Sequence, residues 1–338
     1  MYKDDLVDFM KPQSKNYHDA YFKQVFSKPE NTIDLLQGTL PELSEKLDLK
    51  SLKLDNNSYI NKELSNEYSD LVYNCFYGKE KVKVALLFEH KSKQEINVEF
   101  QLASYIFSVW LYNIKQKEDL IPVIPILFHH GKNKPIIKAF DKLKELPEDL
   151  RKYLPIFEIE LIDISKLNSK DIVTIFQTAQ IQFSIMVMKH IQDNPDKIFQ
   201  ELLRFKNIVK TLLKEENGKE LIYTTTIYIS KKPKTDMETI VNNFTKIEKE
   251  AGNIAKSAWE KEFEKGIIIG IQKGIQKGIQ KGKQEGIQEG IQKGKQEGIQ
   301  EGIISNAKKM LELNIDINLI KEITGLSIEQ IEELKSQI

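Results

Sequence analysis

The chain has 338 residues, more than one average domain needs, so we expect a core domain of enzyme size with further segments attached. Hydrophobic residues make up 40% and charged residues 30% of the chain, which excludes a protein that is disordered throughout. The 50 basic and 50 acidic residues balance, so net charge gives no argument for a nucleic-acid partner, and the single cysteine, Cys75, excludes an internal disulfide and a thiolate zinc cluster.

The first half of the chain alternates between helical and extended patterns. Apolar residues at helical spacing predict two helices in residues 17–40, separated by a turn at residues 27–29. Residues 69–77 and 81–88 have the alternating pattern of strands, and the glycine between them, Gly78, favours a hairpin. A helix is then expected over residues 96–115.

Two apolar runs follow, and both are typical of buried strands. Residues 121–128 are almost continuously apolar, and residues 157–164 resemble them. The pattern is helical from residue 169 to about residue 214 and again from residue 235. This order predicts an α/β fold with a mixed central sheet flanked by helices. We place this domain in residues 1–232, followed by a helical connector in residues 233–265.

Residues 266–302 form a tetrapeptide repeat with ten glycines, one at every fourth position, and isoleucine follows most of them. A period of four exceeds the 3.6 residues of a helical turn, so the isoleucine stripe would drift about 40° per unit. Ten glycines would also cost a helix about 10 kcal/mol relative to alanine. An isolated helix is therefore not expected. The repeat is either packed against a partner chain or a flexible tether.

Residues 303–338 have an ordinary composition and predict a small module of three short helices. A helix–turn–helix order resembles a DNA-reading module, but four lysines against six acidic residues argue against phosphate contact. We expect this α-helical C-terminal extension, together with the repeat, to make the protein a homo-oligomer.

Three charged residues at the ends of the predicted hairpin suggest a catalytic site. Asp70 opens the first strand, and Glu89 and Lys91 close the second. Because strand side chains alternate, Glu89 and Lys91 project to one face while His90 points away. An antiparallel hairpin would bring Asp70 beside them. An isolated Glu-x-Lys is usually an exposed strand end, but here the upstream aspartate, both strands and the following helix occur in order.

Two carboxylates at close range, Asp70 and Glu89, suit Mg²⁺, with Mn²⁺ as a possible substitute. Such an ion lowers the pKa of a bound water and neutralises charge on a phosphate. Lys91 could orient that water or stabilise the transition state as a fixed cation. These groups predict hydrolysis of a phosphodiester.

The pattern Asp70…Glu89-His90-Lys91 resembles the signature of PD-(D/E)XK nucleases. Four segments in order also resemble the recombination-promoting nuclease family, whose members carry a transposase label as well: His-Asp-Ala-Tyr-Phe-Lys at 18–23, Tyr-Ser-Asp at 68–70, Glu-His-Lys-Ser at 89–92 and Ile-Pro-Ile-Leu-Phe-His-His-Gly at 124–131. The resemblance covers about residues 16–232. It implies a bacterial, metal-dependent DNA endonuclease with a restriction-endonuclease-like core, linked to recombination or mobile elements. The acidic first residues do not resemble a signal peptide, so we expect a cytoplasmic protein. Many members carry glutamine where Lys91 stands, and no separate Asp-Asp-Glu triad supports strand transfer.

Further candidates surround this site. Gln101 and Tyr105 are spaced i,i+4 and resemble a Gln-x-x-x-Tyr element of related nucleases, although the polar edge of an amphipathic helix explains them equally well. His129 and His130 end a buried strand at the expected rim of the site, where a structural role is the commoner outcome.

The expected partner is DNA, read with little sequence preference. Residues 79–94 and 131–152 each carry a net charge of +3 and could face phosphates. The chain has only two arginines, Arg151 and Arg204, and reading guanine usually takes an arginine. No stretch is apolar enough to span a membrane, so no membrane partner is expected. The alternative function is a catalytically silent nuclease-fold protein that binds DNA or acts through its tail.

Overall fold

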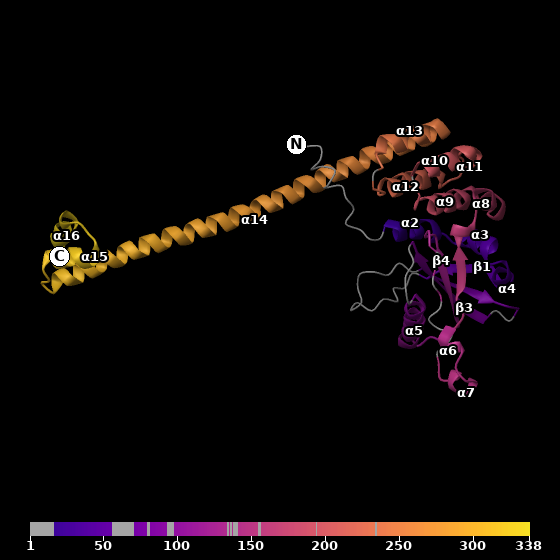
Figure 1. Cartoon of the computed structure of the whole chain (residues 1–338), viewed down its shortest axis with the longest axis horizontal. Helices are drawn as coiled ribbons and strands as arrows, with labels where there is room; N and C mark the ends of the chain where they lie inside the picture. The colour runs from indigo at the N-terminus through magenta and orange to yellow at the C-terminus, as the bar shows by residue number, and fades with distance from the viewer. Residues whose placement is uncertain are drawn as a thin grey trace. The chain divides into compact units, whose positions relative to one another are not determined.

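The computed structural model describes residues 17–55, 71–79, 82–92, 98–133, 135, 137, 141–154, 157–193, 195–233 and 235–338, without the side chains of Lys142 and Lys144. The chain divides into two compact units, Met1–Glu264 and Lys265–Ile338. The first unit combines a sheet with helices, and the second is helical in all its described elements (Figure 1).

The sheet of the first unit has five strands in the spatial order β1-β2-β3-β4-β5. β1, β2 and β3 pair antiparallel, whereas β3, β4 and β5 pair parallel, so the predicted mixed sheet is confirmed. The strands are β1 (Leu47–Leu54), β2 (Leu71–Tyr77), β3 (Val82–Lys91), β4 (Val123–His129) and β5 (Glu160–Asp163).

The predicted hairpin joins β2 to β3. Tyr77 pairs with Val82, and the turn between them begins at Gly78, whose φ of 69° lies in the left-handed region that glycine adopts without strain. The register runs along both strands as far as the pair of Leu71 with Phe88. The start of β2 therefore lies beside the end of β3.

Helices cover both faces of this sheet (Figure 1). One face packs against α2 (Tyr17–Phe26), α3 (Pro29–Thr39) and the helices that follow β5, in a large apolar core that contains Phe22, Phe88 and Phe128. On the other face, Ala85 and Leu87 of β3 pack against α5 (Val98–Gln116) in a smaller cluster. The predicted helices at the start of the chain and after the hairpin are confirmed.

The helices after β5 build the thick side of the core. One of them, the helix over residues 218–230, is not predicted by the sequence pattern. These residues are rich in β-branched and aromatic side chains, which favour strands. Thr225 and Tyr228 are buried on this helix, and Tyr21 shares a hydrogen bond of 2.7 Å with Thr225, so tertiary packing overrides the local preference. The remaining elements of the first unit are α4 (Pro41–Lys46), α6 (Asp141–Lys144), α7 (Glu148–Arg151), η2 (Ile164–Lys166), α8 (Ser169–Ile175), α9 (Ala179–His190), α10 (Pro195–Arg204), α11 (Lys206–Leu212), α12 (Gly218–Ser230) and α13 (Met237–Ile247).

The repeat is helical throughout. It lies within α14 (Lys249–Glu312), a single helix of 64 residues whose first turns contribute Ala251 and Ala255 to the core of the first unit. The expectation that so many glycines prevent an isolated helix therefore differs from the structure. The isoleucines of the repeat are exposed, for example 58% at Ile275 and 67% at Ile291, so contacts within the chain do not offset the cost of the glycines.

The end of α14 packs with two short helices, α15 (Ile317–Thr324) and α16 (Ile328–Lys335). Ala307, Ile320 and Ile331 are fully buried in this small cluster, which confirms the predicted three-helix module. Gly325 ends α15 with a φ of 70°, and Ser327 caps α16 in a capping box with Gln330. Among the described residues, no helix is long and apolar enough to cross a membrane.

Candidate active site

The end of β3 carries two of the three charged residues that the sequence singles out. Glu89 and Lys91 form an ion pair, with 2.7 Å between Oε1 of the glutamate and Nζ of the lysine. Their side chains are only 5% and 11% exposed. Burial of both charges costs desolvation energy that largely offsets their attraction, so folding stability alone does not explain the pair.

Strand alternation separates this pair from His90. Glu89 and Lys91 have the same parity as Ala85 and Leu87, so they lie on the face of β3 that α5 covers. His90 lies on the opposite face, where its ring stacks on Phe22 with 4.8 Å between centroids. The predicted separation of His90 from its two neighbours is confirmed.

His90 is held by the first helix of the described chain. Its Nδ1 is 2.6 Å from Oδ1 of Asp19 on α2, and its side chain is fully buried. This contact ties α2 to the strand segment that carries Glu89 and Lys91. The chain motifs around residues 18–23 and 89–92 therefore meet in space.

Polar residues on the next two strands, β4 and β5, form a row with Lys91. Lys91 pairs with His129 of β4, and His129 pairs with Asp163 of β5, so the three residues lie side by side at the carboxyl ends of parallel strands. Paired residues of parallel strands share a face, which places His129 and Asp163 on the side of Glu89. His129 is fully buried, with Nδ1 3.4 Å from Oδ1 of Asp163, and its Nε2 has no hydrogen-bond partner among the described residues.

Asp163 is held as a carboxylate by its neighbours. Burial by itself raises the pKa of Asp163, but hydrogen bonds from Ser165 and His129 and the nearby charge of Lys166 outweigh it, so the pKa lies below its ordinary value. The Ser165 hydroxyl donates to Oδ1 at 2.6 Å. An ionised Asp163 favours the tautomer of His129 that carries its proton on Nδ1 and leaves Nε2 as an acceptor.

Three buried histidines, His18, His90 and His130, lie close together on the α2 side of the sheet, opposite to Glu89 and Lys91. The ring of His130 is 4.9 Å from that of His90 and 5.2 Å from that of His18. Burial and then the proximity of His90 and His18 lower the pKa of His130 well below its ordinary value. Its Nδ1 donates to the carbonyl oxygen of Met188 at 2.9 Å. His130 is therefore neutral at physiological pH and belongs to the core, which is the commoner role of such histidines.

Two of the predicted site residues on α5 contact each other. Nε2 of Gln101 donates a hydrogen bond to the Tyr105 hydroxyl at 2.5 Å, so the i,i+4 pair lies on one side of the helix. The catalytic role assigned to them stays a prediction. Asp70, the remaining predicted catalytic residue and metal ligand, lies outside the described residues, and β2 is described from Leu71 onward.

Sequence reasoning missed Asp163 as part of this row. Its signal was present, because an acidic residue ends the third of three buried strands, as Glu89 ends the first. The partner strand was predicted, but not its register. For His129 the sequence indicates only a position at the rim of the site, whereas the structure places it in register with Lys91.

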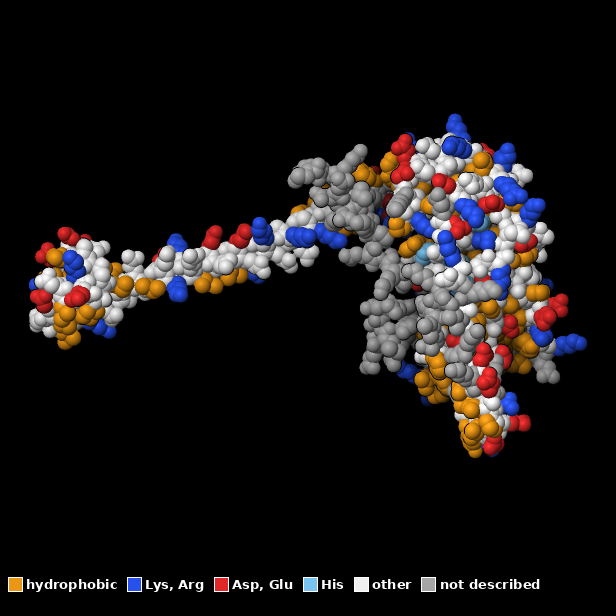
Figure 2. Space-filling model, viewed as in Figure 1, with side chains coloured by type: hydrophobic (Ala, Val, Ile, Leu, Met, Phe, Trp, Pro, Cys, Tyr) orange, Lys and Arg blue, Asp and Glu red, His pale blue; other side chains and the backbone are white. Residues whose placement is uncertain are grey.

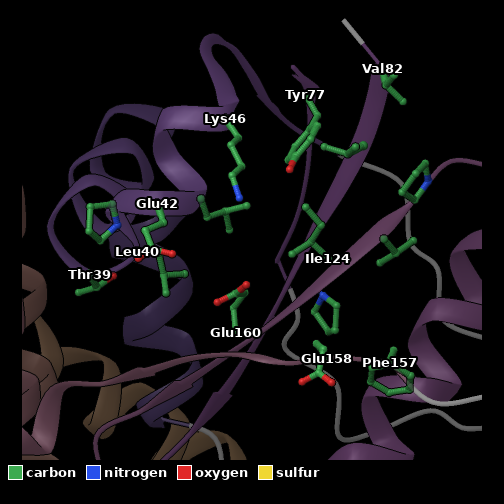
Figure 3. Close-up of a pocket in the computed structure, with 16 residues that line it drawn as sticks. Thr39, Leu40, Glu42, Lys46, Tyr77, Val82, Ile124, Phe157, Glu158 and Glu160 are labelled. Carbon is green, nitrogen blue, oxygen red and sulfur yellow. The ribbon is translucent and has the colours of Figure 1, made fainter. Parts of the chain in front are cut away.

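A separate cavity of about 740 Å³ lies at the opposite end of the strands (Figure 3). Val82 and Ile124, at the starts of β3 and β4, form part of its lining, and Glu42, Lys46 and Glu160 provide polar side chains. Val82 has the parity of Phe88 along β3, and Ile124 and Glu160 share that face through the strand register, so the cavity lies on the face of the sheet opposite to Glu89 and Lys91. The cavity and the candidate site are therefore distinct.

Together the fold and this strand end define an α/β protein with a mixed five-stranded sheet and a buried Glu–Lys pair beside an Asp–His pair. Residues 16–221 match the family model described as "Putative transposase, YhgA-like", which covers more than half of the chain. The chain therefore belongs to this family.

Several curated proteins are similar to the chain. The Inactive recombination-promoting nuclease-like protein RpnE of Escherichia coli strain K12 is 30% identical over 58% of this chain and 64% of its own. Recombination-promoting nuclease RpnD of Escherichia coli O157:H7 is 30% identical over 52% of this chain and 68% of its own. Recombination-promoting nuclease RpnA of strain K12 is 27% identical over 54% and 62%. The chain thus spans about two thirds of the length of these relatives, and no solved structure matches it.

Proposed function

We propose that this protein is a metal-dependent DNA endonuclease of the PD-(D/E)XK type, with weak sequence preference and a role linked to recombination. The observation that carries the proposal is the buried Glu89–Lys91 pair at the end of β3, next to the start of β2. It is supported by the names of RpnD and RpnA, which are recombination-promoting nucleases.

The second carboxylate of the proposed site is Asp70. Leu71 pairs with Phe88, the residue before Glu89. Asp70 is joined to Leu71 by one peptide bond, so their Cα atoms are about 3.8 Å apart. We therefore propose Asp70 as the second carboxylate beside Glu89 and Lys91.

The proposed metal is Mg²⁺, or Mn²⁺ in its place, with Asp70 and Glu89 as ligands. Among the described residues, no group of three or more His, Cys, Asp and Glu side chains could hold a metal ion. Mg²⁺ is usually held by one or two carboxylates and completes its shell with water and substrate phosphate. When bound, such an ion neutralises charge on the phosphate and lowers the pKa of a water molecule.

The side chains around the pair have definite tasks in hydrolysis. A water oxygen bonds to phosphorus and gives up one proton to solvent. The bond from phosphorus to a sugar oxygen breaks, and that oxygen takes the electron pair and a proton from solvent. The Lys91 ammonium, fixed 2.7 Å from Glu89, orients the attacking water and stabilises negative charge in the transition state. Gln101 and Tyr105 support the water or the substrate from α5.

The alternative is a catalytically silent protein that binds DNA or acts through its tail. One observation favours it, because the name of RpnE describes an inactive nuclease-like protein. The retained Glu89–Lys91 pair favours activity, since a site without turnover is free to lose either residue.

Incubation of the purified chain with supercoiled plasmid, with Mg²⁺ and with a chelator, tests the proposal. We expect nicked and linear plasmid in the reaction with Mg²⁺ and intact plasmid in the reaction with chelator. Intact plasmid under both conditions, with the protein folded by circular dichroism, would favour the silent alternative. Hydrolysis that continues in the chelator would refute metal dependence.

A further inference from the structure

A cluster of lysines surrounds Asp193, in the turn that follows α9. Nζ of Lys132 is 3.2 Å from Oδ1 of Asp193, and Nζ of Lys197 is 3.4 Å from Oδ2. Lys232 reaches the same turn from the end of α12 and donates a hydrogen bond to the carbonyl oxygen of Ile191. We call Lys132, Lys197 and Lys232, with Asp193, the Asp193 lysine cluster.

This cluster has an excess of positive charge. Its three ammonium groups face one carboxylate, which leaves a net charge of +2. Burial and then the charge of Lys132 lower the pKa of Lys232, so the lysines repel one another. The side chains of Lys132 and Lys197 are 61% and 51% exposed. Two ammonium groups are therefore presented to solvent with their charge only partly neutralised.

The cluster lies beside the strand end that carries the candidate active site. Nε2 of Gln192 donates to the carbonyl oxygen of Ser92 at 3.3 Å, and Ser92 directly follows Lys91. The amide of His130 donates to the carbonyl oxygen of Lys91 at 3.1 Å. Lys132 follows His130 by two residues, so their Cα atoms are at most about 7 Å apart.

Lysines also predominate on the helices around this turn. Figure 2 shows Lys and Arg side chains over the part of the first unit where Figure 1 labels α9 to α12, with fewer acidic side chains among them. Exposed lysines often form only solvated ion pairs of little energetic value. Here Lys132 and Lys197, from separate segments, share one carboxylate, and Lys232 reaches the same turn, which is unlike such isolated pairs.

We propose that the Asp193 lysine cluster binds the phosphate backbone of double-stranded DNA next to the phosphate that is cleaved. This inference rests on the proposed function, and it assigns the surface that holds the substrate. Lysine meets phosphate as a point charge and carries no base readout. Successive phosphates of one strand rise about 3.4 Å along the duplex axis, so neighbours of the cleaved phosphate are within reach of the cluster.

Salt-dependent binding of the full-length chain to a labelled duplex, in chelator so that hydrolysis does not interfere, tests this assignment. The test variant combines Lys132→Gln and Lys197→Gln. The control combines Lys281→Gln and Lys293→Gln, which removes the same charge from two exposed lysines of the second unit that pair with Glu285 and Glu297. Affinity is measured by fluorescence anisotropy across a range of KCl concentrations.

In the test variant, the magnitude of the slope of log affinity against log salt should fall by about 0.9 for each phosphate contact removed, about 1.8 in all. The control should keep the wild-type slope. A third variant, Asp193→Asn, should bind more tightly, because it removes the carboxylate that competes with phosphate. Equal slopes for the test variant and the control, or no measurable duplex binding by wild type, would overturn the assignment.

The same proteins, assayed on plasmid with Mg²⁺, separate this inference from the proposed function. Tight duplex binding, with a smaller salt slope in the test variant but no hydrolysis, would support the assigned surface and refute the nuclease activity. Hydrolysis by a protein whose test variant binds like the control would support the nuclease and refute the surface. Binding that is equally strong to anionic lipid vesicles, with the same loss in the test variant, would overturn the choice of DNA as partner.

Discussion

At the end of β3, alternation of side chains gives three consecutive residues two different environments. Glu89 and Lys91 form a buried pair on the α5 side, and His90 is tied to Asp19 on the other side. The backbone between them is short and belongs to a paired strand, so the relative positions of the two charges are fixed by the sheet. This rigidity is what a site that orients water and phosphate requires.

Lys91→Gln tests the role of the ammonium group. We predict a loss of cleavage of about 10- to 100-fold, milder than the loss from Glu89→Gln, since an amide can still hold a water by hydrogen bonds but lacks the charge. The measurement is the initial rate of plasmid nicking at saturating Mg²⁺. A loss as complete as that of Glu89→Gln would mean that the charge itself is needed.

Asp163 gives a pH-dependent contribution to stability. Its pKa in the folded protein lies below the ordinary value of 3.8, so its stabilising effect is fully present above that pH and is lost as the pH falls through the folded-state pKa. We predict that Asp163→Asn destabilises the fold by about 2 kcal/mol at pH 7, because two hydrogen bonds from Ser165 and one from His129 lose a charged acceptor.

The check is thermal unfolding of wild type and Asp163→Asn between pH 7 and pH 3. The difference between their midpoints should shrink as the pH falls below about 4, since wild type then protonates the same carboxyl group. A difference that stays constant over this range would mean that Asp163 acts through packing and not through charge.

Individual elements differ in how far sequence predicts them. The hairpin around Gly78 and the apolar strand β4 follow from alternation and a continuous apolar run. The sequence pattern does not predict β1. Its register shifts between Asp48 and Lys53, and such an irregularity breaks the two-residue period of side chains along a strand. Helix α12 was missed because burial of its threonines and Tyr228 overrides β propensity.

The same limit applies to the site. The Glu89–Lys91 pair was predicted, since both residues belong to one strand and alternation fixes their face. The row formed by Lys91, His129 and Asp163 was not, because parallel register depends on crossovers of many residues that leave no local signal. Asp70 lies outside the described residues, so its role stays a prediction.

The glycines of α14 test whether the repeat packs against another chain. A Cβ atom added at Gly274, Gly282 or Gly290 would meet no atom within 4 Å in the single chain. Alanine at these three positions should therefore stabilise a solitary helix by about 1 kcal/mol each. We predict instead that the triple variant weakens association, because alanine occupies the space where a second copy approaches closely.

Analytical ultracentrifugation and circular dichroism distinguish these outcomes. Association through the glycines predicts a smaller mass for the triple variant at matched concentration. An unchanged mass with higher helicity would mean that α14 stands alone and that the repeat is a spacer.

At the scale of the whole molecule, we propose that the second unit assembles the protein and leaves the chemistry to the first. The two units divide after Glu264, and Lys231 pairs with Glu262 upstream of that point. All strands among the described residues, and the helices on both faces of their sheet, belong to the first unit. The tail carries four lysines against six acidic residues in residues 303–338, which disfavours contact with phosphate.

Removal of residues 265–338 should leave a folded, active core with a smaller oligomeric mass. The isolated segment 303–338 should not bind duplex DNA measurably. Light scattering of the full-length and shortened chains at equal concentration measures the first effect. Equal monomeric masses for both would contradict assembly through the tail.

The most direct test of the account compares Glu89→Gln with Glu160→Gln in the plasmid assay with Mg²⁺. Glu89 lies at the carboxyl end of β3, whereas Glu160 begins β5 on the opposite face of the sheet, where it lines the separate cavity. Both changes replace a carboxylate by an amide of the same shape. We predict that Glu89→Gln abolishes cleavage while the protein stays folded and that Glu160→Gln cleaves at the wild-type rate. Wild-type cleavage by a folded Glu89→Gln variant would place the active site elsewhere.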